Sequence, residues 1–221
     1  CGAEIMPREE VRAHVARVVE NLGEFDPVYV VTGDTDFAGD EAIAYYEDAL
    51  DEVVKRAPEA LRTMHINRGN RTIPAQFVDR LDFYMFQPGH NYEGQPEAWR
   101  LPQDFIANYP KKPMVNSEPC YEQMGASRNV YWRFTAQDCR ASVWSSILAG
   151  ASAGVTYGAH GVWNWQTSKS QGSVLGEGFD MPFRWQECLQ FAGVWDFAAI
   201  EHVLAGLGAT ACDDALAVVP A

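Results

Sequence analysis

The sequence has no apolar run of the roughly 18–20 residues that a membrane-spanning helix needs, so we expect no membrane partner. Positive charge is also scarce, with 17 Lys and Arg against 30 Asp and Glu and a formal net charge of −13. Nucleic acids and anionic bilayers are bound through clustered Lys and Arg side chains. The charge balance therefore argues against a nucleic-acid partner as well.

The residue spacings of metal and nucleotide sites are missing. The five cysteines include no CxxC pair, and the five histidines show neither HxH nor HExxH spacing, so we expect no bound metal and no other cofactor. An odd number of cysteines also argues against a disulfide framework. Neither GxGxxG nor GxxxxGK[ST] follows the first predicted strand, so a nucleotide site lacks its fingerprint.

What is present is a globular composition of 221 residues, 47% of them hydrophobic, 21% charged and 12% aromatic. The chain begins at Cys1 with neither an initiator Met nor a signal-peptide pattern, so we expect a fragment of a longer protein. Residues 218–221 look like the start of a strand. We therefore expect a catalytic domain over residues 1–208 and a following segment, a β-domain being one candidate, from 209 to 221.

Helical and extended patterns alternate along the chain. Continuous apolar runs such as Val28–Thr32 are typical of strands that are buried on both faces of a parallel sheet. Apolar residues at helical spacing lie between these runs. We predict strands over 28–32, 61–66, 81–86, 112–116 and from 155, and helices over 8–22, 39–56, 73–79, 102–108, within 128–149, 183–191 and 195–204.

This alternation predicts parallel βαβ units in an α/β fold. An open doubly wound sheet is one alternative, but it lacks the phosphate-binding fingerprint. Polar and aromatic residues follow every predicted strand, which is typical of a (β/α)₈ TIM barrel whose site lies at the carboxyl ends of its strands. We therefore expect strands four to eight of such a barrel, with the first three strands missing from this fragment.

The stretch from Pro113 to Glu122 contains the strongest candidate for catalysis. Pro119 offers no N–H to a sheet and keeps Glu118 out of the helical region, so the strand should end there. Asp34 follows the first predicted strand in the same way, with Asp36 as its fallback. Two carboxylates facing each other across a barrel mouth suit glycoside hydrolysis, in which one acts as acid/base and the other as nucleophile or base.

Aromatic residues near the strand ends fit a sugar ligand, because flat rings pack on sugar C–H surfaces while polar neighbours bind hydroxyl groups. Core packing is the alternative role for each tryptophan, and a structural role is the alternative for each histidine and for Arg68. The candidate substrate-binding residues are Asp36, Arg68, His90, Tyr121, Glu122, Tyr157, His160, Trp163 and Trp165.

Four segments together resemble the apiosidase-like glycoside hydrolase family, formerly a domain of unknown function that often precedes a putative collagen-binding domain. They are Val31–Asp34, Phe86–His90, Asn116–Glu122 and Thr156–Trp163. They occur in the family's order and span most of the chain. Three departures from the family's patterns lie beside the site, at Thr32, Pro88 and Asn116–Ser117, and these leave the identity of the sugar open.

This resemblance implies a (β/α)₈ barrel in a bacterial enzyme that acts on plant-type or other complex polysaccharide, in a secreted or periplasmic location. The family's catalytic Asp would fall on Asp34 and its catalytic Glu on Glu118. The partner would be an oligo- or polysaccharide substrate. The competing hypothesis is a non-catalytic carbohydrate-binding or structural barrel.

Overall fold

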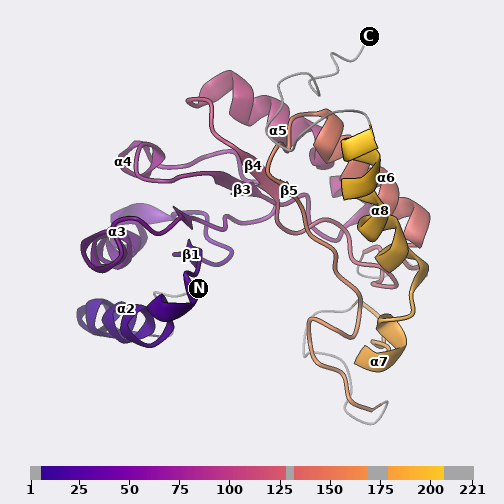
Figure 1. The fold of residues 1–221 in the computed structure, drawn as a ribbon, viewed down its shortest axis with the longest axis horizontal. Coiled ribbons are helices and arrows are strands. Elements are labelled where there is room, and N and C mark those ends of the chain that lie inside the picture. The colour runs from indigo at the N-terminus through magenta and orange to yellow at the C-terminus, as the bar shows by residue number, and fades with distance from the viewer. Residues whose placement is uncertain (1–5, 128–131, 169–178, 207–221) are drawn as a thin grey trace.

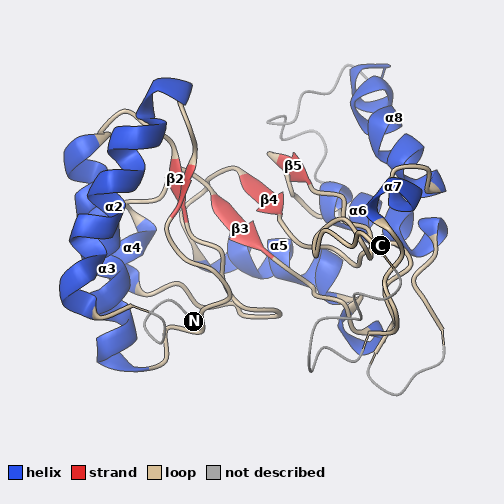
Figure 2. Ribbon diagram, turned by 90° about the horizontal axis from the view of Figure 1, so that it is seen from below, coloured by secondary structure: helices blue, strands red, loops and turns tan. Residues whose placement is uncertain are grey.

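The computed structural model describes residues 6–127, 132–168 and 179–206, and its strands lie in a row at the centre with helices on either side (Figures 1 and 2). The elements are, in chain order, α2 (Arg8–Leu22), η1 (Gly23–Phe25), β1 (Tyr29–Val30), α3 (Gly39–Arg56), β2 (Arg62–Thr63), α4 (Ala75–Val78), β3 (Tyr84–Phe86), η2 (Tyr92–Gly94), α5 (Glu97–Asn108), β4 (Met114–Asn116), α6 (Ala136–Leu148), β5 (Gly154–Val155), α7 (Trp185–Cys188) and α8 (Ala192–Gly206). The predicted segment 209–221 falls outside the described residues. No helix in the described part of the chain is both long and apolar enough to cross a membrane.

The strand pairs in the described part of the chain are all parallel, as predicted. β1 pairs with β2, and β3, β4 and β5 form a second sheet in that order. Hydrogen bonds join the two sheets between β2 and β3, from Asp82 N to Arg62 O at 3.0 Å and from Thr63 Oγ1 to Phe83 O at 2.7 Å. The strands therefore follow one another in sequence order, without the reversal that a doubly wound sheet shows at its ligand site.

The strands are shorter than predicted, but ladder hydrogen bonds continue beyond them. Tyr29 N donates to Leu61 O at 2.9 Å, and an isolated parallel bridge pairs Thr35 with Ile66. A second parallel bridge pairs Glu122 with Ala159 beyond β4 and β5. These bridges keep the strand exits side by side, and candidate site residues lie in those exits.

Helices α2 and α3 have the predicted bounds and pack against each other. The core beneath them includes Leu50, Phe77 and Phe86, whose side chains are fully buried. Each such side chain stabilises the fold by about 1.5–3 kcal/mol relative to an exposed position. The burial of these core side chains holds in place the strands whose carboxyl ends carry the candidate site residues.

Helix α5 begins at Glu97, five residues earlier than predicted, and so contains Pro102. Proline lacks the N–H that would bond the carbonyl four residues before it. That carbonyl, Ala98 O, instead accepts a hydrogen bond of 2.8 Å from Ser146 Oγ of α6. The neighbouring helix α6 thus supplies the hydrogen bond to Ala98 O that Pro102 cannot donate.

Helix α6 starts at a capping box, in which Thr135 Oγ1 accepts from Asp138 N and the Asp138 carboxylate accepts from Thr135 N. The capping box fixes the start of α6, and the helix lies inside the predicted range 128–149. The helix predicted over 183–191 is shorter, as α7, because only Trp185–Cys188 is helical. The strand predicted from 155 is short: β5 covers only Gly154–Val155, one residue before and one within the predicted strand. An isolated parallel bridge at Ala159 continues its pairing.

Candidate active site

Four consecutive strand exits bring their polar side chains together. Asp34 follows β1, His65 follows β2, His90 follows β3 and Glu118 follows β4. Asp34 has a left-handed backbone with φ 46°, a conformation that Asp tolerates better than most residues and that is frequent at functional sites. The carboxyl ends of these parallel strands therefore form one polar edge.

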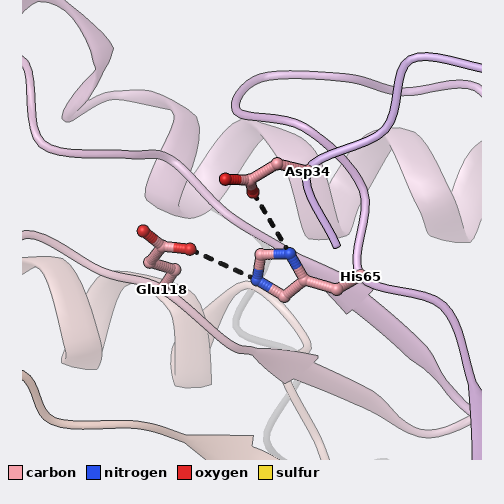
Figure 3. Close-up of side chains that lie close together, drawn as sticks. All are labelled: Asp34, His65 and Glu118. Carbon is pink, nitrogen blue, oxygen red and sulfur yellow. Dashed lines mark ion pairs between the residues drawn. The ribbon is translucent and has the colours of Figure 1, made fainter. Parts of the chain in front are cut away.

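His65 lies between the two candidate catalytic carboxylates (Figure 3). Its Nδ1 is 3.3 Å from Asp34 Oδ1, and its Nε2 is 3.3 Å from Glu118 Oε2. An oxygen of Asp34 and an oxygen of Glu118 lie within 4.8 Å of each other. The imidazole of His65 therefore contacts both carboxyl groups at once and keeps them close together.

Each carboxylate has a further donor. His90 Nε2 lies 2.7 Å from Glu118 Oε1, and Gln87 Nε2 donates to Asp34 Oδ1 at 2.5 Å. Gln87 also donates to Ile66 O at 3.0 Å, which ties the exit of β3 to that of β2. The Glu118 backbone N–H donates to Asn116 Oδ1 at 3.3 Å, so the strand end itself orients the glutamate.

The charges of this group follow from these contacts. Burial alone would raise the pKa of Glu118, but hydrogen bonds from His65 and His90 outweigh it and lower the pKa to about 2. Burial likewise opposes the charge of His65, yet Asp34 and Glu118 raise its pKa to about 9. The His65 hydrogen bond lowers the pKa of Asp34 against the effects of burial and of the Glu118 charge. At neutral pH the group is thus an imidazolium between two carboxylates.

These three side chains also offer one metal-ligating atom each within 4.8 Å of one another. A protonated imidazole, however, has no free lone pair for a cation, because both of its nitrogens carry protons. A cation could bind these three residues only with release of a proton from His65. In the protonated state that the contacts favour, the group is arranged for proton transfer.

A cavity of about 820 Å³ opens over the carboxylates, within the size range of small-molecule sites. Six predicted site residues line it: Asp34, Arg68, His90, Glu118, Tyr121 and Trp163. The other lining residues are Asn67, Gln87, Gly89, Asn91, Glu93, Met124, Ser127 and Phe179. Polar side chains and rings thus surround the carboxylates, as a sugar ligand requires.

Tyr121 packs its ring against His90, with ring centroids 4.1 Å apart. Burial first, and then the charges of Glu118 and Asp34, raise the pKa of its phenol, so the hydroxyl keeps its proton. A Cβ on Gly158 would lie 2.0 Å from the Tyr121 ring. Glycine at position 158 therefore makes room for this side chain.

The other five predicted binding residues are not among the described residues that line the cavity. Asp36 accepts a hydrogen bond of 2.9 Å from Asn67, which does line it. Trp165 is 59% exposed and stacks on Trp185 with ring centroids 4.6 Å apart. Both therefore lie beyond the residues that enclose the carboxylates.

His160 lies behind the cavity wall. It is buried, and its Nε2 lies 2.9 Å from Asp180 O while its Nδ1 accepts from Trp163 Nε1 at 3.3 Å. Burial lowers the pKa of His160 and so favours the neutral ring that this pairing requires. His160 therefore positions Trp163, which lines the cavity.

Glu122 is buried and bonds within the protein. Its Oε2 accepts from Tyr157 OH at 2.7 Å and from Gly193 N at 2.9 Å. Burial, and then the Glu122 contact, raise the pKa of Tyr157. These contacts join the exits of β4 and β5 to the start of helix α8.

His65 and Gln87 were missed as site residues by the sequence reasoning. Gln87 lies in the segment Phe86–His90 directly after a predicted strand, and that position was the available signal. His65 lies inside the predicted strand 61–66, so it was assigned to the sheet and not to the site. The structure ends β2 at Thr63, and this early end exposes His65 to the carboxylates.

Comparison with known proteins agrees with the fold. The model of the family described as "Apiosidase-like, catalytic domain" matches residues 2–210. No curated protein matches the chain.

Two of the solved structures that match share the fold over most of this chain. One is titled "Glycoside hydrolase", with 21% identity and a TM-score of 0.74 over 90% of this chain and 47% of its own. The other is a glycoside hydrolase family 5 protein from Bacteroides vulgatus ATCC 8482, with 22% identity and a TM-score of 0.75 over 91% of this chain and 45% of its own. The chain thus spans about half the length of either protein. From the match over residues 2–210, the chain belongs to the apiosidase-like catalytic-domain family.

Proposed function

We propose that this chain is the catalytic part of a glycosidase that cleaves glycosidic bonds in plant-type or other complex polysaccharide. The observation that carries the proposal is the pair Asp34 and Glu118, whose oxygens come within 4.8 Å over one polar cavity. Retaining glycosidases place their two carboxyl groups about 5–5.5 Å apart, and inverting ones about 6.5–9.5 Å. The 4.8 Å limit applies to the nearest oxygens and not to the carboxyl centres. A gap this small nevertheless leaves little room for the water that an inverting enzyme holds between its carboxyl groups, so we assign the pair a retaining mechanism.

In this mechanism Glu118 is the nucleophile. Its low pKa keeps it ionised, so its carboxylate attacks the anomeric carbon and forms a glycosyl ester as the bond to the leaving oxygen breaks. Asp34 gives a proton to that oxygen. In the second step Asp34 takes a proton from water and passes it back to His65, while the hydroxide left from that water cleaves the ester and frees the Glu118 carboxylate.

The proton that Asp34 delivers comes from its pair with His65. A general acid works best with a pKa near the operating pH, whereas Asp34 alone is held below its ordinary value. His65, with a pKa of about 9, is protonated at neutral pH and lies 3.3 Å from Asp34. We assign His65 the role of supplying the proton that Asp34 passes on.

The same proposal includes the barrel. The sequence-ordered parallel strands and the family match support strands four to eight of a (β/α)₈ barrel. The first three strands would then come from a preceding part of a secreted or periplasmic protein. Residues 1–208 would form the barrel portion.

The test is hydrolysis by Glu118→Gln and Asp34→Asn in the full-length protein, measured over a panel of aryl glycosides and plant polysaccharides. We expect Glu118→Gln to lose at least about 10⁴-fold in kcat on every cleaved substrate, and Asp34→Asn to lose about 10²–10⁴-fold. Glu59→Gln, an exposed carboxylate elsewhere, is the control. Unchanged hydrolysis in both variants would exclude the assignment, and binding without any turnover by the wild type would favour a non-catalytic carbohydrate-binding barrel.

A further inference from the structure

A second hollow lies next to the cavity over Asp34 and Glu118. Its volume is about 420 Å³, and it lies between η2, the start of α5 and α6. Its lining residues are Tyr92, Glu93, Gln95, Pro96, Trp99, Trp132, Phe134, Asp138, Ala141, Ser142 and Ser145. We call it the aromatic groove.

The segment 89–95 separates the groove from the cavity. Glu93 lines both hollows. Gln95 lines the groove, and its Nε2 donates to Gly89 O at 3.2 Å and to Asn91 O at 3.0 Å. Gly89 and Asn91 in turn line the cavity, so a chain of sugar units leaving the cavity over Glu93 enters the groove directly.

The groove offers ring faces to such a chain. Tyr92 is 59% exposed and Trp99 is 39% exposed, although aromatic residues are usually buried. Trp132 holds Tyr92 in an edge-on contact, with ring centroids 5.6 Å apart. Exposed rings held in place beside an active site suit the flat C–H faces of pyranose rings.

The groove also has polar atoms without a partner in the described part of the chain. Gln95 Oε1 and Ser142 Oγ are buried and make no hydrogen bond there. The Ser142 residue is 5% exposed, so its hydroxyl is strongly desolvated. Unpaired buried polar groups are costly, and a ligand hydroxyl on the groove wall would satisfy them.

The charge of the groove selects among sugars. Glu93 and Asp138 place carboxylates on its wall, and the whole chain is acidic. A uronic acid would meet like charges there, whereas neutral hydroxyl groups can donate to the carboxylates. The groove therefore favours neutral sugar units.

We propose that the aromatic groove is a carbohydrate subsite that holds a neutral pyranose unit of the substrate away from the bond that is cleaved, between Tyr92 and Trp99 on one side and Ser142 on the other. This inference rests on the proposed function, because it extends the same substrate from the cavity. It makes the substrate a glycan of several neutral units and not a single glycoside.

The test measures binding of cellotetraose, xylotetraose, mannotetraose and galactotetraose to the full-length Glu118→Gln protein by isothermal titration. We expect at least one to bind, and Tyr92→Ala and Trp99→Ala to weaken that binding about tenfold each. Trp195→Ala removes a ring that is 68% exposed on α8 and serves as the matched control, with unchanged affinity.

Ser142→Ala gives an independent readout. Removing a buried hydroxyl that has no partner should leave the Tm of the free protein unchanged or higher, while the affinity for the tetrasaccharide falls about fivefold. A merely structural serine would lower the Tm and leave the affinity unchanged.

Three results would overturn the subsite: none of the four probes binds at about 10 mM, the aromatic variants bind as tightly as the parent protein, or tetragalacturonate binds more tightly than every neutral probe. The two proposals fail separately. Loss of binding in Tyr92→Ala and Trp99→Ala supports the subsite even where no glycoside is hydrolysed, and hydrolysis with binding insensitive to both variants removes the subsite alone.

Discussion

Among the single residues of the candidate site, His65 has the largest effect on the charges of its neighbours. It contacts both carboxylates at 3.3 Å, and the pKa values of all three groups depend on these contacts. A neutral side chain at position 65 would leave two carboxylates close together without a positive charge between them. Burial and mutual repulsion would then favour a proton on one of them.

Replacing His65 should therefore change the pH profile in a defined direction. In the wild type, the proton shared by Asp34 and His65 is lost near the His65 pKa of about 9, which sets the alkaline limb of kcat/KM. In His65→Asn the proton must reside on Asp34, so the alkaline limb should move to lower pH by about two units or more. His14→Asn, an exposed histidine on α2, should leave the limb in place. An alkaline limb that stays near pH 9 in His65→Asn would contradict the role of His65.

The two candidate carboxylates could be predicted from the sequence because a proline and a glycine beside them mark the ends of strands. Pro119 predicts the end of a strand next to Glu118, and Gly33 precedes Asp34 directly after an apolar run. His65 has no such marker, because a parallel ladder can end within an apolar run and nothing local shows where. Its contact with Glu118 joins exits of two strands and arises only when the sheet forms.

Among the secondary-structure elements, helix α8 is joined to the exits of β4 and β5 by hydrogen bonds to Glu122. The carboxylate of Glu122 accepts from the backbone N–H of Gly193, the second residue of α8. A negative charge at this end is favourable, because the first N–H groups of a helix are unpaired and its dipole is positive there. The Tyr157 hydroxyl donates to the same oxygen, so one carboxylate joins three elements.

Gly193→Ala tests this junction. A Cβ at position 193 would lie 2.3 Å from Glu122 Oε2 and 3.1 Å from the Tyr157 ring. We expect the free energy of unfolding to fall by about 1–3 kcal/mol, measured by urea denaturation. Gly206→Ala in the same helix meets no atom of the described residues within 4 Å and should leave stability unchanged or slightly raised. Equal stability of the two variants would show that the junction is not close-packed.

The elements differ in how far their sequences determine them. Helices α2 and α3 have long apolar stripes, and their bounds were predicted correctly. Helix α5 was predicted too short because proline usually marks a first turn, and only the Ser146 hydroxyl of another helix makes an interior Pro102 acceptable. The strands were predicted too long because apolar runs continue into the bridges and exits beyond the regular ladder.

The charged centre also affects the stability of the whole molecule. The Glu118 pKa falls from 4.5 to about 2, so its contribution is present above pH 4.5 and is lost as pH falls towards 2. The His65 pKa rises from 6.5 to about 9, so its contribution is present below pH 6.5 and is lost as pH rises through 9. The contribution of the pair is therefore largest between pH 4.5 and 6.5.

The double variant Glu118→Gln/His65→Asn should remove this dependence. We expect the wild type to lose on the order of 2 kcal/mol of unfolding free energy between pH 6 and 9 through His65, and the double variant to lose markedly less. Urea denaturation at half-unit steps of pH measures both curves. Parallel curves would show that the centre does not titrate with folding.

Chemical rescue by azide tests the central claim, that Glu118 attacks the anomeric carbon, most directly. In Glu118→Ala a small anion can enter the space of the missing carboxylate and attack the same carbon. With an aryl glycoside that the wild type cleaves, the full-length variant should be nearly inactive alone and should gain at least about 10²-fold with azide. The product should be a glycosyl azide of inverted configuration. A variant that hydrolyses the glycoside at the wild-type rate, or forms no inverted azide while Asp34→Ala does, would contradict the account.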